Sequence, residues 1–279
     1  MASSRDRQRQ LARAKLDRQT ARRTARARRQ RQIRAGVAGG IALLVIVVGA
    51  LWMGGVFDKK PTPPAAIGDC TWQPNKAPGV KDVGTPATTG MAKSGVAPME
   101  ITTNLGAISA ELDVAKSPCA AESFRFLASK KYFDNGPCHR LSTENLFVLQ
   151  CGSHNAEGTG EPGYTYASEN LPQVPAPDPT ASPSATPTEP KVTYAAGTIA
   201  LVTKGANTNS GQFMIFYKDT PASPAYSVVG KVTKGLDLIT KAAEAGAVDA
   251  SGAKVKDGKP KNDIIIQSLT VAKPTESAT

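Results

Sequence analysis

The chain has 279 residues and a formal net charge of +11, but its 34 Lys and Arg and 23 Asp and Glu are unevenly distributed. Residues 1–34 hold 13 Lys or Arg and 2 Asp or Glu, a net charge of +11, whereas residues 35–279 hold 21 of each sign and are neutral. The high pI therefore describes an N-terminal arm. This distribution excludes a basic surface for nucleic acid over the whole folded body.

The arm, residues 1–34, is rich in Arg, Gln and Ala and contains few large apolar residues, so it cannot form a hydrophobic core. Its charges are typical of a cytoplasmic topology signal near anionic lipid, where each basic residue contributes about 1 kcal/mol of attraction. Contact with nucleic-acid phosphates is the alternative. We favour the lipid interpretation and expect no nucleic-acid partner, because no aromatic residue or motif accompanies the charges.

A run without charged side chains, residues 35–57, follows the arm. As a helix it would span about 35 Å, enough for a hydrocarbon core of about 30 Å. A cleaved signal peptide is the alternative, but both the charged lead and the apolar run are long for one. We therefore expect a single transmembrane helix that contacts membrane lipid. The charge excess before it predicts a cytoplasmic N-terminus in the cell membrane and an extracytoplasmic remainder.

Residues 58–97 are predicted to be an extracytoplasmic linker, because their first part is rich in proline and polar residues. Cys70 and Trp72 interrupt this polar run. A Cys and a Trp are unusual in a free linker, so we expect this part to dock back on the domain.

All four cysteines follow the apolar run and so fall in a compartment where disulfides persist. Their spacing, with only two histidines in the chain, fits no common zinc pattern, and we expect no metal site. Three pairings are open, and we put Cys119–Cys138 only marginally first because these two flank the first predicted helix. The disulfide candidates are Cys70, Cys119, Cys138 and Cys151.

The folded body is predicted to span residues 98–273, with a tail at 274–279. Alternating apolar residues and turn residues predict about eight short, mostly antiparallel strands and two helices, a mainly β fold. Ser117 and Pro118 predict the N-cap and first residue of the first helix. The strands are expected at 99–104, 108–114, up to Arg140, 146–150, 197–203, 212–217, 226–232 and 263–271, and the helices at 118–131 and around 236–243.

Two segments of the body are predicted to be loops. Residues 171–190 hold 7 of the 21 prolines, so they indicate an extended surface insertion that buries no core. The glycine-rich residues 152–164 do not indicate a phosphate-binding loop, because no Gly-Lys-Ser/Thr follows and the context is not strand-to-helix.

The stretch 138–152 places Arg140 close in sequence to an apolar strand that ends in Gln150. The guanidinium has five donors and stays charged at ordinary pH. Brought to one apolar face, the Arg and the Gln could polarise a carbonyl or amide without any nucleophile. The alternative for Arg140 is a purely structural ion pair, and His139 is expected to pack rather than to act as a base.

Five motifs in order make the body, about residues 95–273, resemble the cyclophilin-type peptidyl-prolyl cis-trans isomerases. The spacing from Arg140 to Gln150, with Cys151 next, resembles a membrane-anchored or secreted bacterial branch of that family. The motifs lie at residues 123–127, at 139–140 with 147–152, at 158–164, at 205–213, and at 229–232 with 235–237.

The resemblance implies an eight-stranded antiparallel barrel capped by two α-helices, with a peptide groove on its outer face. It also implies an isomerase that assists the folding of extracytoplasmic proteins, binds proline-containing peptides and unfolded proteins, and needs no cofactor. By position, Arg140 is implied to be the catalytic residue. The implied substrate-binding residues are Phe147, Val148, Gln150, Thr203, Gln212, Met214, Ala222 and Tyr226.

The chain departs from the family pattern on one wall of the implied groove. Met214 occupies the position at which the family usually has a second Phe. Thr203 and Lys204 occupy the positions at which it usually has Asn-Ala. Ala222 occupies the position of the Leu that usually lines the proline pocket in the family. Tyr226 occupies the position of the family's His in the following loop. We therefore expect weaker or altered activity. The alternative function is a cyclophilin-fold binding or chaperone module that holds proline segments with weak or no turnover.

Overall fold

The computed structural model describes residues 69–174 and 190–275. The basic arm, the apolar run 35–57 and the start of the linker lie outside the described residues, as do most of the proline-rich insertion and the end of the tail. In the described ranges, neither helix is long and apolar enough to cross a membrane.

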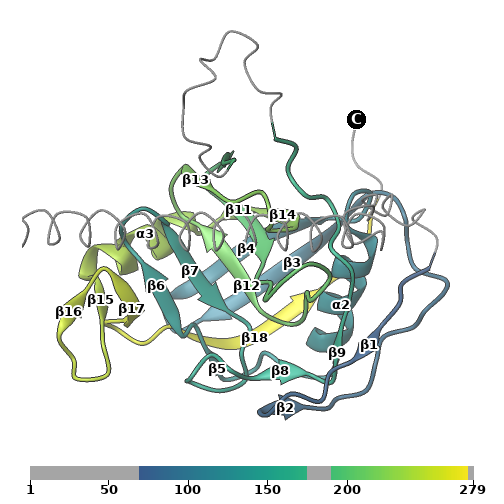
Figure 1. Cartoon of the computed structure of the whole chain (residues 1–279), viewed down its shortest axis with the longest axis horizontal. Helices are drawn as coiled ribbons and strands as arrows, with labels where there is room; N and C mark the ends of the chain where they lie inside the picture. The colour runs from purple at the N-terminus through teal and green to yellow at the C-terminus, as the bar shows by residue number, and fades with distance from the viewer. Residues whose placement is uncertain (1–68, 175–189, 276–279) are drawn as a thin grey trace, which may run out of the picture. The chain divides into compact units, whose positions relative to one another are not determined.

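Two α-helices and many short strands make up the described part of the chain (Figure 1). The helices are α2 (Pro118–Ser129) and α3 (Leu236–Ala245). The strands are β1 (Gln73–Pro74), β2 (Val80–Lys81), β3 (Val96–Thr103), β4 (Gly106–Asp113), β5 (Gly136–Pro137), β6 (Arg140–Ser142), β7 (Val148–Cys151), β8 (Glu161–Pro162), β9 (Tyr164–Thr165), β10 (Val192–Tyr194), β11 (Thr198–Leu201), β12 (Phe213–Phe216), β13 (Thr220–Ala222), β14 (Val228–Lys234), β15 (Ala247–Val248), β16 (Lys254–Val255), β17 (Asp257–Pro260) and β18 (Ile265–Val271).

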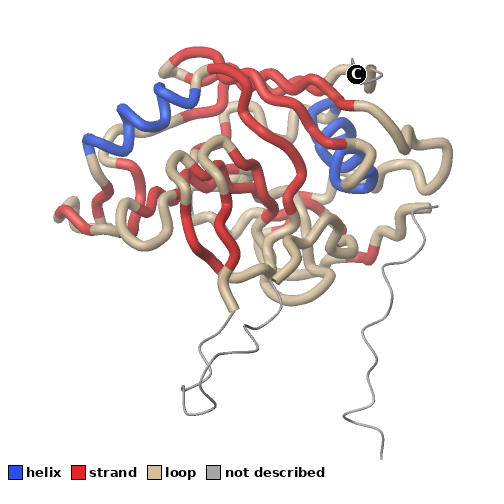
Figure 2. Tube along the Cα trace, turned by 90° about the horizontal axis from the view of Figure 1, so that it is seen from above, coloured by secondary structure: helices blue, strands red, loops and turns tan. Residues whose placement is uncertain are grey.

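Twelve of these strands form one sheet in the order β16-β15-β17-β6-β7-β12-β11-β14-β4-β3-β18-β5, and all neighbours are antiparallel. Only residues 138 and 139 separate β5 from β6 in the chain, although eight strand pairings separate them across the sheet. The sheet must therefore curl round on itself. Figure 2 shows the two helices at opposite sides of the curled strands.

The expected closed barrel of eight strands is not what the described residues form. No ladder joins β16 to β5, the two ends of the sheet as described. The free edge of β6 is instead taken by β17, which the sequence did not predict. On the other side, the backbone N–H of Cys138 donates to the carbonyl of Ile264 at 2.8 Å and ties the β5–β6 link to the start of β18.

Alternating residues of the strands divide the apolar side chains into two clusters, as the two-residue period of a strand requires. The larger cluster fills the inside of the curl and takes in the apolar face of α2. The smaller cluster lies on the outer face of β7, β11 and β12, and we call it the groove cluster. Its buried members are Val148, Tyr194, Ala200, Met214, Phe216 and Ala222.

Helix α2 begins as expected with Ser117 before Pro118, but Ser117 makes no side-chain capping bond. Its hydroxyl donates instead to the carbonyl of Val228 at 2.8 Å. The carboxylate of Glu169 takes the capping role by accepting the N–H groups of Cys119 (3.1 Å) and Ala120 (2.9 Å). Those two donors have no partner inside the helix, so a distant carboxylate stabilises them.

The disulfides are Cys70–Cys119 and Cys138–Cys151, so the pairing of Cys119 with Cys138 is wrong. Cys119 lies in the first turn of α2, and about 15 Å of helix leads away from it before the chain turns towards Cys138. The register of β6 and β7 places Arg140 opposite Gln150, and this brings Cys138 beside Cys151.

The first described residues of the linker pack on the folded body, which confirms that Cys70 and Trp72 dock back. The Trp72 ring meets Tyr164 and Tyr166 edge-on at centroid distances of 5.2 and 5.4 Å. Its Nε1 donates to the carbonyl of Ala87 at 3.0 Å.

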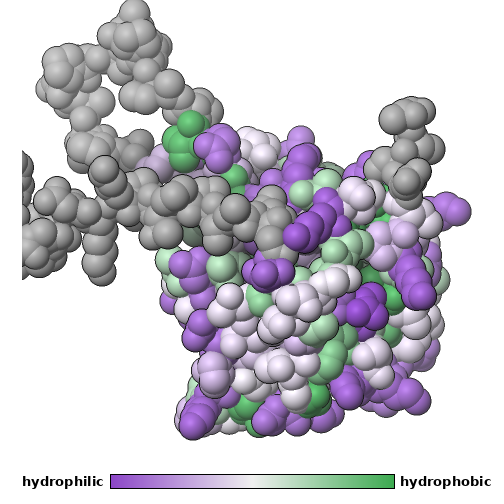
Figure 3. Space-filling view, turned by 90° about the vertical axis from the view of Figure 1, so that its right-hand side faces the viewer, coloured by the Kyte–Doolittle hydropathy of each residue, from purple (hydrophilic) through white to green (hydrophobic). Residues whose placement is uncertain are grey.

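On the side of the molecule that carries α2, small apolar patches are set among polar residues (Figure 3).

Candidate active site

Backbone register gathers the candidate residues on the outer face of the sheet. Arg140 on β6 lies opposite Gln150 on β7, and Gln150 lies opposite Met214 on β12. Met214 in turn pairs with Ala200 on β11. The guanidinium, the amide and the thioether therefore stand in one row beside the groove cluster.

The Arg140 guanidinium is held on two sides. Its Nε and Nη2 donate to the two carboxylate oxygens of Asp257 at 2.8 and 2.7 Å, and its Nη1 donates to Oε1 of Gln150 at 3.2 Å. The hydrogen bond and charge of Asp257 raise the pKa of Arg140, so the group stays charged. Three of its five N–H donors thus have partners among the described residues, which leaves two for a substrate.

A chain of amide hydrogen bonds fixes the orientation of Gln150. The Nε2 of Gln212 donates to the carbonyls of Gly158 (2.9 Å) and Gly160 (3.2 Å), which leaves its Oε1 as an acceptor. That oxygen accepts from Nε2 of Gln150 at 3.0 Å. The Oε1 of Gln150 must therefore face Arg140, because an amide has donors on one side only.

The groove cluster is apolar and tightly packed. Tyr194 stacks on Phe216 with ring centroids 4.6 Å apart and planes within 3°, and its hydroxyl donates to the carbonyl of Ser223 at 2.9 Å. Val148 is 0% and Met214 2% exposed. A ligand would reach these two side chains through the partly buried rim that packs on the cluster. The rim consists of Leu146, Val192, Val202, Tyr226 and Val228.

Most of the predicted site residues come together. Arg140, Gln150 and Gln212 form the polar wall, and Tyr226 lies near enough to Arg140 for its phenol to raise the guanidinium pKa. The other residues that meet at the site are Val148, Met214 and Ala222, all in the groove cluster.

Phe147 lies apart from the groove cluster, whereas Thr203 directly follows Val202 of the rim. Phe147 packs with the inner core, its ring centroid 6.0 Å from that of Tyr217 and 5.1 Å from the ammonium of Lys218. It immediately precedes Val148, and neighbouring residues on a strand point to opposite faces. The Thr203 hydroxyl bonds to that of Thr208 at 3.0 Å within its own loop.

Three residues of the site were not predicted from the sequence. Tyr194 and Phe216 belong to the groove cluster. Phe216 could have been predicted, because it follows Met214 by two positions on one strand and such residues share a face. Tyr194 could not, because it lies on β10, outside the twelve-stranded sheet. Asp257 holds Arg140 from 117 positions away in the chain. No local pattern indicates a role for Asp257, because the lysines and glycines around it are typical of an ordinary exposed turn.

The ring of His139 packs in the interior, as expected. Burial first, and the charge of Arg140 second, lower its pKa to about 4, so the ring is neutral at pH 7. Its ring nitrogens are buried without a partner among the described residues. Gly158 leaves room for this ring, because a Cβ at that position would collide with it.

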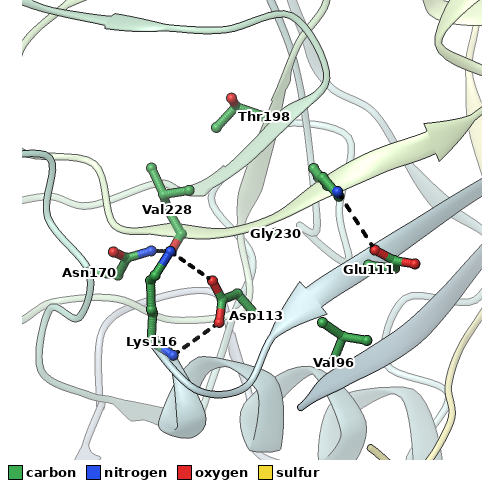
Figure 4. Close-up of a pocket in the computed structure, with 9 residues that line it drawn as sticks. Val96, Glu111, Asp113, Lys116, Asn170, Thr198, Val228 and Gly230 are labelled. Atoms are coloured by element: carbon green, nitrogen blue, oxygen red, sulfur yellow. Dashed lines mark hydrogen bonds and ion pairs between the residues drawn. The ribbon is translucent and has the colours of Figure 1, made fainter. Parts of the chain in front are cut away.

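A cavity of about 390 Å³ lies on the same outer face of the sheet, beside the groove cluster (Figure 4). Val228 belongs both to the rim of the cluster and to the cavity wall. Glu111 and Asp113 line it together with lysines, and Lys116 pairs with Asp113 at 3.4 Å.

Across the described residues, no group of three or more His, Cys, Asp or Glu is arranged to hold a metal ion.

Comparison with known proteins decides the family. The model for "Cyclophilin type peptidyl-prolyl cis-trans isomerase/CLD" matches residues 98–271. This chain belongs to the cyclophilin family. This cyclophilin is 38% identical over 213 residues to a probable peptidyl-prolyl cis-trans isomerase B of Mycobacterium tuberculosis. The match covers 74% of this chain and 65% of the relative.

Two further cyclophilins are similar to the chain. A probable peptidyl-prolyl cis-trans isomerase B of Mycobacterium leprae is 39% identical over 174 residues, with 60% of this chain and 54% of the relative covered. The chain thus spans less than two thirds of the length of these mycobacterial relatives. A crystal structure of a Cryptosporidium parvum cyclophilin has a TM-score of 0.49 and 23% identity, with 64% of this chain and 99% of that one covered.

Proposed function

We propose that this cyclophilin is a peptidyl-prolyl cis-trans isomerase, with Arg140 as its catalytic residue. The observation that carries the proposal is the arrangement of Arg140. A permanent cation, fixed by Asp257 and Gln150, keeps two N–H donors at the edge of an apolar cluster.

The chemistry needs a fixed cation and no nucleophile. A prolyl bond isomerises slowly because its amide has partial double-bond character and a barrier of about 18–20 kcal/mol. Twisting the amide localises a lone pair on the prolyl nitrogen. A guanidinium at that nitrogen stabilises the twisted form more than either planar form, which lowers the barrier. The apolar cluster would hold the ring away from water and strengthen this interaction.

Arg140→Ala should lower kcat/KM by about 10²–10³-fold, in the range found when one stabilising donor is removed from a transition state. The full-length chain, in detergent, is assayed with an Ala-Ala-Pro-Phe peptide coupled to proteolysis of the trans form. Arg125→Ala is the matched control, because Arg125 is also ion-paired, with Glu122 on α2, but lies in another element. Equal rates for the wild type and Arg140→Ala would exclude the proposal.

A binding module without efficient turnover is the second candidate. The burial of Val148 and Met214 favours it, because a proline ring would have to displace or pass the rim to reach them. In that case the full-length chain would bind proline peptides, and Arg140→Ala would weaken binding without changing the background rate.

We further propose that residues 35–57 anchor the chain in the cell membrane, with the cyclophilin domain outside the cytoplasm, where it would act on unfolded proteins. The uncharged run and the +11 charge of the arm before it support this orientation. Two disulfides, which persist in oxidising compartments, also support it.

The orientation is tested by adding protease to intact cells. We expect the protease to remove the cyclophilin domain and to spare an epitope placed on the arm. Protection of the domain until the membrane is permeabilised would contradict an extracytoplasmic location.

A further inference from the structure

The geometry points to Asp257 as a positioning residue for catalysis, one that sets the orientation of Arg140 without touching the substrate. This inference rests on the isomerase function proposed above. It concerns the segment 247–260, whose strands β15, β16 and β17 extend the sheet beyond β6.

The contact between the two side chains is bidentate. Both carboxylate oxygens of Asp257 accept, one from Nε and one from Nη2 of Arg140, at 2.8 and 2.7 Å. Two parallel bonds fix the plane of the guanidinium, whereas a single bond would let it rotate. The Gln150 bond on Nη1 adds a third fixed point. The remaining two N–H groups, one on Nη1 and one on Nη2, are thereby held in that same plane.

The backbone that carries Asp257 is itself fixed. Strand β17 pairs with β6 so that Asp257 lies opposite Ser142 and Gly258 lies opposite Leu141. Gly258 is pressed against β15, since a Cβ at that position would collide with the carbonyl oxygen of Val248. Asp257 thus projects from a strand held on both edges, which suits a residue that must orient another.

Stabilising the fold is a poor explanation for this pair. The side chains of Arg140 and Asp257 are 37% and 46% exposed, and ion pairs at such sites contribute little to stability. The carboxylate also reduces the positive potential that Arg140 offers a prolyl nitrogen. If charge alone mattered, removing Asp257 would raise activity. If orientation matters more, removing it lowers activity, and these opposite signs make the two roles separable.

Asp257→Asn tests the inference in the full-length chain, because the amide keeps the shape of the side chain and one oxygen acceptor. We expect kcat/KM on the Ala-Ala-Pro-Phe peptide to fall roughly tenfold, with the loss mainly in kcat, because the misplaced cation stabilises the twisted amide less. Asp237→Asn is the matched control, since Asp237 forms an exposed ion pair with Lys241 on α3. This control should leave the rate unchanged.

A second measurement does not depend on turnover. The Nε–H of Arg140 is followed by ¹⁵N NMR and assigned by its loss in Arg140→Lys. It should exchange slowly with water in the wild type and in Asp237→Asn, and at least several-fold faster in Asp257→Asn. An unchanged or higher kcat/KM in Asp257→Asn would overturn the positioning role. So would an unchanged Nε–H exchange rate, even if the wild type proved to have no isomerase activity at all.

Discussion

Arg140 shows how two interpretations of one residue can both hold at the residue scale. A structural ion pair was the alternative to a catalytic role, and the side chain does pair with Asp257. The pair occupies only one side of the guanidinium, and Gln150 occupies one further donor. Because two donors remain, the ion pair is compatible with the catalytic role that we propose for Arg140.

His139 gives a pH prediction at this scale. Its pKa in the folded chain is about 4, below the ordinary 6.5, so the folded state binds its proton less tightly than the unfolded state. Its contribution to stability is therefore complete above pH 6.5 and is lost as the pH falls from 6.5 towards 4. The loss is at most about 3 kcal/mol.

Urea unfolding at about pH 7 and about pH 4.5 measures this loss. His139→Gln should flatten that part of the pH dependence, and His139→Phe should do the same without the polar group. His154→Gln is the control, since His154 is a more exposed histidine whose pKa is also lowered by partial burial. An unchanged pH dependence in both His139 variants would contradict the assignment.

At the element scale, the long strands and helices followed from local pattern, and the short ones did not. The hairpin of β3 and β4 and the helices α2 and α3 lie within a few residues of where apolar periodicity placed them. Strands of two or three residues, such as β15 and β16, carry too little alternation to be recognised. The capping of α2 by Glu169 was also not predicted, because helix propensity depends on neighbouring residues and Glu169 is 49 residues from Ala120.

The two disulfides should differ in what they stabilise. In the chain-entropy account, the 49-residue separation of Cys70–Cys119 corresponds to about 4 kcal/mol and the 13-residue separation of Cys138–Cys151 to about 3 kcal/mol. Only the second lies beside the Arg140–Gln150 pair. We therefore expect Cys70→Ser/Cys119→Ser to lose more stability but to keep its kcat/KM.

Each double serine variant serves as the control for the other. Cys138→Ser/Cys151→Ser should lose less free energy of unfolding in urea but should have a lower kcat/KM, because β6 and β7 are no longer tied together beside Arg140 and Gln150. The reverse pattern, with catalysis lost only when the Cys70 pair is removed, would contradict this division of roles.

At the scale of the whole molecule, the sequence predicted that the body is mainly β with two helices, and residues 69–174 and 190–275 confirm this. It did not predict that the strands extend past β6 through β15, β16 and β17. Most of the polar wall could be read from the sequence, because Arg140 and Gln150 lie on consecutive strands of one antiparallel pair. Asp257 and Tyr194 could not, because Asp257 pairs with Arg140 from 117 positions away and Tyr194 lies on β10, outside the twelve-stranded sheet.

If the proposed function is right, this cyclophilin speeds the interconversion of prolyl isomers, and NMR exchange on an Ala-Pro peptide observes that step directly. With a catalytic amount of the full-length chain, we predict exchange between the cis and trans resonances far faster than the uncatalysed rate, with the cis:trans ratio unchanged. Arg140→Ala should return the exchange to near the uncatalysed rate. If the wild-type chain binds the peptide while exchange stays at the uncatalysed rate, the molecule is a binding module, and its assignment as an isomerase is contradicted.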